Sequence, residues 1–244
     1  MSRRILVTGA ASGIGAALAA RLAAAGDTVI GLDRAGCEVT CDLADPAAIA
    51  SAAAGIAGPL DGIAHVAGLP GTADPQAIMA VNCEAPRLLT EALAPRLAPG
   101  AGVVAVASVT AARCPLDDPD KDRWLARPLA ERPALADGKT AYEYSKALLI
   151  RWVQHAAADF RARGVRVNAV SPGPVETPIL ADFEASIGAD RIAAAAALTG
   201  RHAWPDEIGA VVQFLLGPDA GWINGTDIKV DGGYHALRSV GGTG

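Results

Sequence analysis

The sequence has few aromatic residues, few cysteines and no excess of positive charge. Phe, Trp and Tyr make up 4% of its 244 residues, and the formal net charge is −5. An acidic chain lacks the basic surface that binds a phosphate backbone or an anionic membrane, so we expect no nucleic-acid partner. The four cysteines have no Cys-x-x-Cys spacing, and we interpret them as structural thiols of an intracellular chain.

Long apolar runs and metal-ligand patterns are also missing. No stretch reaches the roughly 18 uninterrupted apolar residues that a membrane span needs. The residues that follow Met1 contain too short an apolar run for the core of a signal peptide. We therefore expect a cytoplasmic protein with no membrane partner. His65, His155, His202 and His235 are scattered without the spacing of metal ligands, which predicts no metal site.

The sequence does contain a regular alternation of apolar runs and helical segments. Seven runs predict buried strands, at 4–7, 28–32, 38–41, 62–66, 103–107, 165–170 and 227–230. Helical patterns lie between them, at 16–25, 46–54, 82–97, 141–163 and 206–216. Strands that alternate with helices predict a parallel sheet covered on both faces. We therefore predict an α/β fold, a single doubly wound Rossmann-type domain over 1–244 with a seven-stranded parallel sheet.

A glycine-rich turn, Thr8-Gly9-Ala10-Ala11-Ser12-Gly13-Ile14-Gly15, follows the first predicted strand and opens the first predicted helix. Glycines at these positions permit a tight turn, a close approach of the backbone to a pyrophosphate, and close packing of the helix on the strand. The N-terminus of the helix also favours negative charge. An ordinary glycine-rich loop is the alternative, but the place between a buried strand and a helix favours a dinucleotide site.

Tyr142 and Lys146 lie four residues apart in a predicted helix, so both side chains emerge on one face. An ammonium beside a phenol favours the phenolate and lowers the phenol pKa. Moving that pKa from about 10 to about 7 takes roughly 4 kcal/mol, which the ammonium and an oxidised nicotinamide ring together would supply. Tyr144 lies about 200° round the helix from Lys146 and faces away. Ser108 ends a strand at the carboxyl edge of the sheet, where such sheets bind ligands.

In their order along the chain, these motifs resemble the pattern of the short-chain dehydrogenase/reductase family, and the resemblance covers nearly the whole sequence. The matching residues are Gly9, Gly13, Gly15, Asp33, Ala67, Gly68, Asn82, Ser108, Tyr142, Lys146, Pro172, Gly173, Asp231, Gly232 and Gly233. The resemblance implies hydride transfer between a nicotinamide and a substrate carbon. Tyr142 then exchanges the hydroxyl proton, Ser108 orients the oxygen, Lys146 holds the nicotinamide ribose, and Asn82 kinks its helix and holds a water that links Lys146 to solvent.

The resemblance also implies a set of cofactor-binding residues. They are Gly9, Ser12, Gly13, Ile14, Gly15, Asp33, Asp42, Leu43, Ala67, Gly68, Tyr142, Lys146, Pro172, Gly173 and Thr177. Asp33 ends the second strand, where a carboxylate accepts hydrogen bonds from both ribose hydroxyls and repels a 2′-phosphate, so we predict NAD. Arg34 could instead bind that phosphate. By resemblance Asp42 contacts the adenine amino group and Leu43 packs nearby, but an Asp ahead of a helix is equally typical of a cap.

The residues His65-Val66-Ala67-Gly68 stand where the family has Asn-Asn-Ala-Gly. Because both asparagines are missing, any polar bridge that they make must be replaced or absent. His65 ends a strand at the cofactor edge of the sheet. We favour a structural or adenosine-side role for His65 over a catalytic one.

Two segments interrupt the alternation. The first, an insertion at about 113–139 between Ser108 and Tyr142, mixes charged residues with spaced apolar ones, which predicts one or two short helices. The insertion could cover the outer faces of neighbouring helices, or extend over the substrate mouth with Trp124 as an apolar wall. The second, at about 178–203, is small and apolar and lies where the family has its substrate lid.

Within the family, the chain resembles the bacterial 3α-hydroxysteroid dehydrogenase/carbonyl reductase branch. We expect an NAD(H)-dependent oxidoreductase that interconverts a hydrophobic secondary alcohol, a hydroxysteroid or another cyclic alcohol, and its ketone. The sequence shows no arginine cluster for a carboxylate or phosphate. We also expect a homo-oligomer, a dimer or tetramer, built through the helices of Asn82 and Tyr142. The alternatives are a non-catalytic dinucleotide-binding redox sensor and a reductase that prefers NADP.

Overall fold

A parallel sheet of seven strands forms the centre of the molecule, a computed structural model that describes residues 2–240. The strand order is β3-β2-β1-β4-β5-β6-β7, and every neighbouring pair is parallel. The strands are β1 (Arg4–Thr8), β2 (Thr28–Asp33), β3 (Val39–Thr40), β4 (Leu60–His65), β5 (Leu97–Val106), β6 (Arg166–Pro172) and β7 (Asp227–Val230). The predicted fold class is confirmed. The order reverses between β1 and β4, and ligands of open sheets bind beside such a reversal, at the carboxyl ends of the strands.

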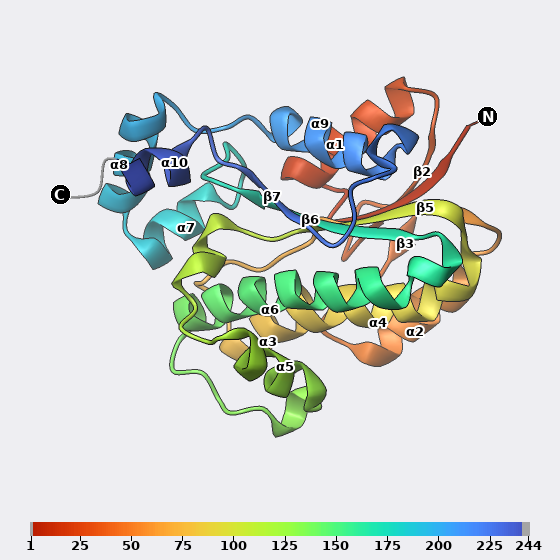
Figure 1. The fold of residues 1–244 in the computed structure, drawn as a ribbon, viewed down its shortest axis with the longest axis horizontal. Coiled ribbons are helices and arrows are strands. Elements are labelled where there is room, and N and C mark those ends of the chain that lie inside the picture. The colour runs from red at the N-terminus through yellow and green to blue at the C-terminus, as the bar shows by residue number, and fades with distance from the viewer. Residues whose placement is uncertain (1, 241–244) are drawn as a thin grey trace.

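Helices cover both faces of the sheet, as Figure 1 shows with the sheet seen edge-on. One face carries α1 (Gly13–Ala24) and α9 (Pro205–Leu216), and the other carries α2 (Pro46–Gly55), α4 (Ala85–Leu93) and α6 (Gly138–Asp159). A separate apolar cluster fills the space between the sheet and each helix layer. Burial of both faces explains why the strands are short, nearly continuous apolar runs in the sequence.

The long helix expected to contain 82–97 is not uniform and does not reach 97. It starts earlier, as α3 (Pro75–Met79), passes through a π-helical segment η1 (Ala80–Glu84), and continues as α4. The Asp74 carboxylate accepts hydrogen bonds from the first turn of α3, so the start is a capped helix with Pro at its first position. The chain then passes through a 3₁₀ turn, Ala94–Arg96, and enters β5 at Leu97. The expected helical end at 97 is therefore wrong.

The helix that carries Tyr142 also begins earlier than expected. Asp137 caps α6 by accepting a hydrogen bond from the Thr140 N–H at 2.7 Å, so the helix starts at Gly138 and not at 141. Its α-helical part ends at Asp159, and 3₁₀ residues continue to Arg163. Pro205 occupies the first position of α9, as expected of a helix start.

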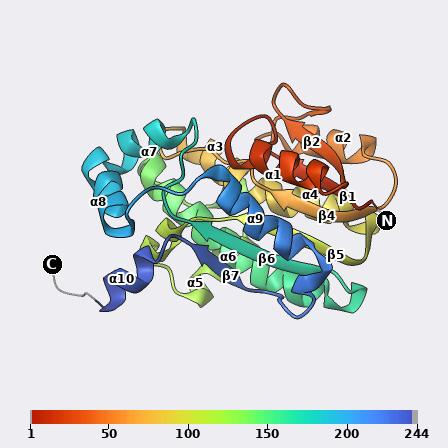
Figure 2. The same ribbon diagram turned by 90° about the horizontal axis from the view of Figure 1, so that it is seen from above.

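Three helices lie beyond the carboxyl ends of the strands, at one end of the molecule in Figures 1 and 2. They are α7 (Leu180–Ile187), α8 (Ala189–Thr199) and α10 (Tyr234–Val240). The first two form most of the apolar segment that follows β6. Among residues 2–240, no helix is both long enough and apolar enough to cross a membrane.

The insertion between β5 and α6 packs on the outer side of α6. It contains α5 (Asp118–Ala126), and its Asp122 carboxylate pairs with Arg151 of α6 at 2.7 Å. The Trp124 ring packs edge-on against Tyr144 of α6, with their centroids 5.5 Å apart. The insertion therefore covers a helix face, and the alternative expectation that Trp124 forms a wall of the substrate mouth is wrong, because Trp124 does not line the cavity described below.

Candidate active site

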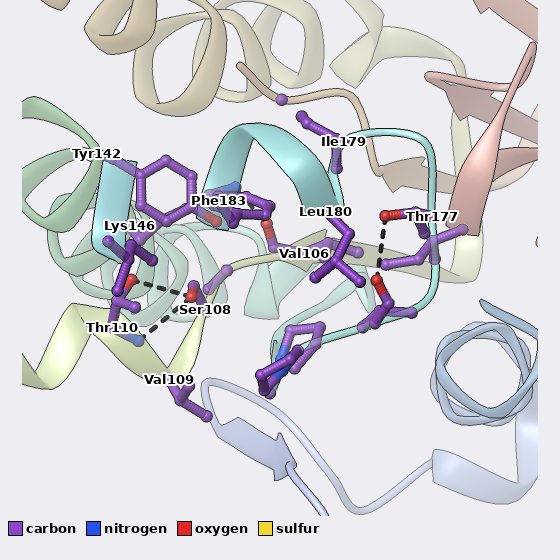
Figure 3. A pocket seen from close by; sticks show the side chains of 18 of the residues that line it. Val106, Ser108, Val109, Thr110, Tyr142, Lys146, Thr177, Ile179, Leu180 and Phe183 are labelled. Atoms are coloured by element: carbon purple, nitrogen blue, oxygen red, sulfur yellow. Dashed lines mark hydrogen bonds between the residues drawn. The ribbon is translucent and has the colours of Figure 1, made fainter. Parts of the chain in front are cut away.

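A cavity of about 160 Å³ lies at the carboxyl edge of the sheet, where Tyr142, Lys146 and Ser108 meet the apolar segment after β6. Figure 3 shows Tyr142, Lys146, Ser108 and Thr110 on one side, and Ile179, Leu180 and Phe183 opposite them. Most of the lining is apolar. Its polar lining side chains are Ser108, Thr110, Arg113, Tyr142, Lys146, Thr177, Arg191 and Tyr234.

Tyr142 and Lys146 share one face of α6 and are both buried, at 8% and 4% exposure. The Lys146 ammonium lies 5.6 Å from the centroid of the Tyr142 ring and donates a hydrogen bond to the Val106 carbonyl at 2.8 Å. The Tyr142 ring packs edge-on against Phe183 of α7, with their centroids 5.1 Å apart. The phenol thus lies between the end of β5 and the apolar segment after β6.

The ionisation of this pair without a bound cofactor is set mainly by burial. Burial raises the pKa of Tyr142 to about 12, and the hydrogen bond with Ser108 lowers it only in part. Burial also lowers the pKa of Lys146 to about 8. Lys146 alone therefore does not bring the phenol pKa down, because burial has the largest effect on both groups. The protein's own groups hold Tyr142 as the neutral phenol, which is the form that donates a proton.

The Ser108 hydroxyl has a fixed direction. It ends β5 and caps the following 3₁₀ segment η3 (Val109–Arg113), accepting hydrogen bonds from the Thr110 N–H at 3.2 Å and the Thr110 hydroxyl at 3.0 Å. A serine hydroxyl offers two acceptor lone pairs and one donor. Because Thr110 occupies the acceptor side, the Ser108 proton is left to donate to Tyr142 or to an oxygen in the cavity. This role of Thr110 was not predicted from the sequence.

Asn82 is 1% exposed and fixes the loop after β4. Its amide oxygen accepts from the Leu69 N–H at 2.7 Å, and its NH₂ donates to the Leu69 carbonyl at 3.0 Å and to Ser145 Oγ at 3.3 Å. The surrounding π-helical turn shifts the helix register, and such turns are frequent at functional sites. The structure thus gives Asn82 a loop-positioning role, while its implied water link stays a prediction.

Thr8 makes a polar bridge to the loop after β4, beside the positions where the family has its asparagines. Its hydroxyl oxygen accepts hydrogen bonds from the N–H groups of Val66 at 3.0 Å and Ala67 at 3.1 Å, tying β1 to the loop after β4. The backbone approach is close here, because a Cβ on Gly9 would lie 2.8 Å from the Ala67 nitrogen. The Thr8 hydroxyl and the absence of a side chain on Gly9 together keep the loop after β4 next to the glycine-rich turn.

The glycine-rich turn has the geometry that a pyrophosphate needs. Gly9 and Gly13 have φ values of +69° and +53°, which favour glycine. A Cβ on Gly15 would lie 2.0 Å from the Gly9 carbonyl oxygen, so the turn packs too tightly for any side chain there. Ser12 stands at the N-cap of α1 without a side-chain cap bond, so the first amides of α1 remain available to an anion. The residues present fit a dinucleotide.

The acidic residues near the adenosine side have separate roles. Asp33 ends β2 and accepts from the N–H of Ala11 in the turn at 3.2 Å, so its carboxylate lies beside the turn. Asp42 is not the helix cap that was considered, because Asp45 caps α2 by accepting from the Ala47 N–H at 2.8 Å. Leu43 is 8% exposed and belongs to the core cluster under α2 and α4. An adenine contact by Asp42 or Leu43 stays a prediction.

The remaining cofactor candidates divide by position. Those that line the cavity are Ile14, Gly68, Tyr142, Lys146, Pro172, Gly173 and Thr177. Thr177 lies against the glycine-rich turn, since its methyl carbon would be 3.3 Å from a Cβ on Gly13. Gly9, Ser12, Gly13, Gly15, Asp33, Asp42, Leu43 and Ala67 do not line this cavity. The lining therefore includes Lys146, which the resemblance assigns to the nicotinamide ribose, while Asp33 and the glycines of the turn lie outside it.

His65 is a core residue and not part of the cavity. It is 3% exposed, its Nε2 lies 2.7 Å from the Thr90 hydroxyl, and its ring packs edge-on against Trp152. Burial lowers the pKa of His65 to about 3. The structural role that the sequence favoured agrees with this placement.

The His65 pKa predicts a loss of stability in acid. Between its ordinary pKa of 6.5 and a folded value of about 3, the unfolded chain binds a proton that the folded chain excludes. The stabilising contribution is present above pH 6.5 and is lost as the pH falls towards 3, by at most about 1.4 kcal/mol per pH unit. Denaturant unfolding at several pH values measures this effect. For His65→Gln, the free energy of unfolding should decrease less steeply as the pH falls from 6.5 towards 3 than it does for wild type.

Two arginines in the lining were not foreseen. Arg113 ends the 3₁₀ segment after Ser108, and Arg191 lies in the first turn of α8. The sequence shows no arginine cluster, because Arg113 and Arg191 are far apart along the chain and only the fold brings both to the lining of one cavity. Within residues 2–240, no group of three or more His, Cys, Asp or Glu side chains is arranged to hold a metal ion.

Comparisons with known proteins agree with this geometry. A family model described as enoyl-(acyl carrier protein) reductase matches residues 130–235. Coniferyl-alcohol dehydrogenase from a Pseudomonas species (strain HR199) is 38% identical, over 95% of this chain and 96% of that protein. The 3-alpha-hydroxysteroid dehydrogenase/carbonyl reductase of Comamonas testosteroni is 34% identical, over 96% of both chains. The crystal structure of 3-alpha-hydroxysteroid dehydrogenase from Pseudomonas sp. B-0831 complexed with NADH has a TM-score of 0.86 at 36% identity, covering 97% of this chain and 98% of that one.

Proposed function

The chain belongs to the short-chain dehydrogenase/reductase family, and from this premise we propose that it interconverts a hydrophobic secondary alcohol and its ketone with NAD(H). The observation that carries this proposal is the cavity in which Ser108, Tyr142 and Lys146 face an apolar wall. A hydroxysteroid or another cyclic alcohol suits such a lining, in agreement with the relative from Comamonas testosteroni.

Each polar side chain has a distinct part in the proposed reaction. In the reductive direction the neutral Tyr142 phenol donates its proton to the carbonyl oxygen as that oxygen gains charge, and in oxidation the same atom accepts the proton. Ser108, oriented by Thr110, donates a hydrogen bond to that oxygen. The Lys146 ammonium places a positive charge beside the phenol. A bound nicotinamide dinucleotide supplies the hydride donor or acceptor.

The preference for NAD depends on Asp33. The Asp33→Ala variant is expected to bind NAD about ten- to hundredfold more weakly, because hydrogen bonds to a charged group are worth roughly 1.5 to 3 kcal/mol. Its relative affinity for NADP should rise, since repulsion of a 2′-phosphate is lost. Dissociation constants for both cofactors, measured for wild type, Asp33→Ala and Arg34→Ala, check this. A wild-type enzyme that already prefers NADP in kcat/KM would show that Arg34 governs recognition.

A substrate panel followed by NADH absorbance tests the proposed function. We expect oxidation of a 3α-hydroxysteroid and of simple cyclic alcohols, and no oxidation of a polyol such as threitol, because the lining is mostly apolar. Coniferyl alcohol belongs in the panel because the relative at 38% identity is named for it. NADH binding without turnover of any alcohol or ketone would instead favour a redox sensor.

We also propose a homo-oligomer, and the insertion bears on its assembly. Because α5 lies on the outer side of α6, replacing Pro115 to Asp137 with a short loop uncovers a helix face. The fold and NADH binding should persist, while assembly or substrate KM changes. Light scattering that shows a wild-type monomer contradicts the oligomer, and unchanged assembly and kinetics contradict the role of the insertion.

A further inference from the structure

The cavity is lined by cationic side chains and by no carboxylate. Within residues 2–240 its charged lining residues are Arg113, Lys146 and Arg191, and no Asp or Glu is among them. The chain as a whole has the opposite balance, with a net charge of −5. Clefts with low-dielectric walls concentrate the field of the charges that line them. A cationic cavity in an acidic protein is therefore a local feature that favours a negatively charged ligand.

Lys146 is not the only source of positive charge among the described residues that line the cavity, because Arg113 and Arg191 contribute as well. It is 4% exposed, and its ammonium donates to the Val106 carbonyl next to Tyr142. The two arginines come from other segments, Arg113 from the first turns of the insertion and Arg191 from the first turn of α8. Neither residue has a part in the proton or hydride transfer proposed above.

The guanidinium groups of Arg113 and Arg191 both have N–H donors that remain available to a ligand. Arg113 Nη1 lies 3.5 Å from Glu143 Oε1, a loose ion pair with a carboxylate whose side chain is 15% exposed. This contact orients Arg113 and leaves most of its N–H groups unused. Arg191 makes no side-chain hydrogen bond or ion pair with any residue in the range 2–240. A guanidinium presents five N–H donors in a planar fork that matches a carboxylate.

We propose that the substrate is an amphiphile, with an apolar body that carries the reacting carbinol and a carboxylate at its remote end, and that Arg113 and Arg191 bind this carboxylate. This inference rests on the proposed function and narrows its substrate class. The apolar body lies against Val109, Leu180, Phe183 and Ile187, which also line the cavity. The carbinol then meets Tyr142, while the charged end lies at the arginines.

Matched acid and ester pairs test the proposal. We would compare 4-hydroxycyclohexanecarboxylate with its methyl ester, and a 3α-hydroxysteroid acid with its methyl ester, because the two pairs differ in length. Wild type should have the higher kcat/KM for the acid of at least one pair. The Arg113→Gln/Arg191→Gln double variant should lose about ten- to hundredfold in kcat/KM for that acid, mainly through KM, since charged hydrogen bonds are lost. Its kcat/KM for the ester should stay unchanged.

A control arginine and an inhibitor separate local binding from general charge effects. Arg161 is exposed in the 3₁₀ turn after α6, outside the cavity lining, so Arg161→Gln should leave both substrates unaffected. Cyclohexanecarboxylate, which lacks the reacting hydroxyl, should inhibit wild type more strongly than the double variant.

The outcomes distinguish this inference from the proposed function. Equal kcat/KM for acid and ester in wild type, or an equal loss for both in the double variant, overturns the carboxylate site while leaving the alcohol dehydrogenase in place. An equal loss in Arg161→Gln has the same consequence. If wild type oxidises neither acid nor ester nor any neutral alcohol, the proposed function fails and this inference fails with it.

Discussion

Replacing Tyr142 with Phe is expected to lower kcat by about 10² to 10⁴, the usual cost of removing a general acid or base. The phenol hydroxyl is the group placed to exchange a proton with the substrate oxygen, and Phe keeps the ring that packs on Phe183. NADH affinity should stay within a few-fold of wild type, because the proposed part of the hydroxyl is proton transfer and Phe keeps the ring that lines the cavity. Steady-state kinetics and NADH fluorescence titration measure the two quantities separately.

Tyr144→Phe is the matched control for this variant. Tyr144 lies on the same helix, but its ring packs on Trp124 of the insertion, away from the cavity. Within residues 2–240 its hydroxyl has no hydrogen-bond partner, so Phe should be nearly silent there. If Tyr142→Phe kept more than roughly a tenth of wild-type kcat, the acid/base assignment would be wrong, because that loss is far below the expected range.

The features that the sequence predicted well are those that depend on local chemistry. Gly9 and Gly13 need positive φ, and the buried strands need continuous apolar residues, so both are visible without a structure. The four-residue spacing of Tyr142 and Lys146 likewise fixes one helix face. The ends of helices were less certain, although the caps Asp74 and Asp137 were present as signals.

The features that the sequence did not predict depend on distant packing. The π-helical turn at Asn82 has no distinctive pattern, and the pKa of Tyr142 depends on a burial that spacing does not reveal. The meeting of Arg113 and Arg191 at one cavity follows from the fold alone. Thr110 could have been noticed, because a threonine two residues after a strand-ending serine can bond back to it.

A buried ion pair holds the insertion against the helix of Asn82. Glu84 lies in the same π-helical turn as Asn82, and its carboxylate pairs with Arg132 of the insertion at 2.6 Å. Their side chains are 6% and 3% exposed. Arg87 pairs with the second Glu84 oxygen at 2.8 Å, but its side chain is 32% exposed and it also contacts Glu91. Arg132 therefore depends on Glu84 for its charge partner, whereas Arg87 does not.

Glu84→Leu is accordingly expected to lower the free energy of unfolding by about 3 to 5 kcal/mol, because it leaves the Arg132 guanidinium buried without a carboxylate. The double variant Glu84→Leu/Arg132→Met should recover a large part of that loss, since an apolar pair carries no unpaired charge. Urea denaturation of wild type, both single variants and the double variant gives the coupling energy.

An exposed ion pair of the same insertion provides the comparison for this cycle. Asp120 and Arg123 of α5 also pair, but with 40% and 64% of their side chains exposed, so Arg123→Met should cost less than about 1 kcal/mol. If Glu84→Leu cost no more than Arg123→Met, the pair would not anchor the insertion. A large loss for Glu84→Leu that the double variant recovers would instead mean that the loss comes from the unpaired Arg132 charge, and that the insertion and the turn of Asn82 pack against each other through this buried pair of positions.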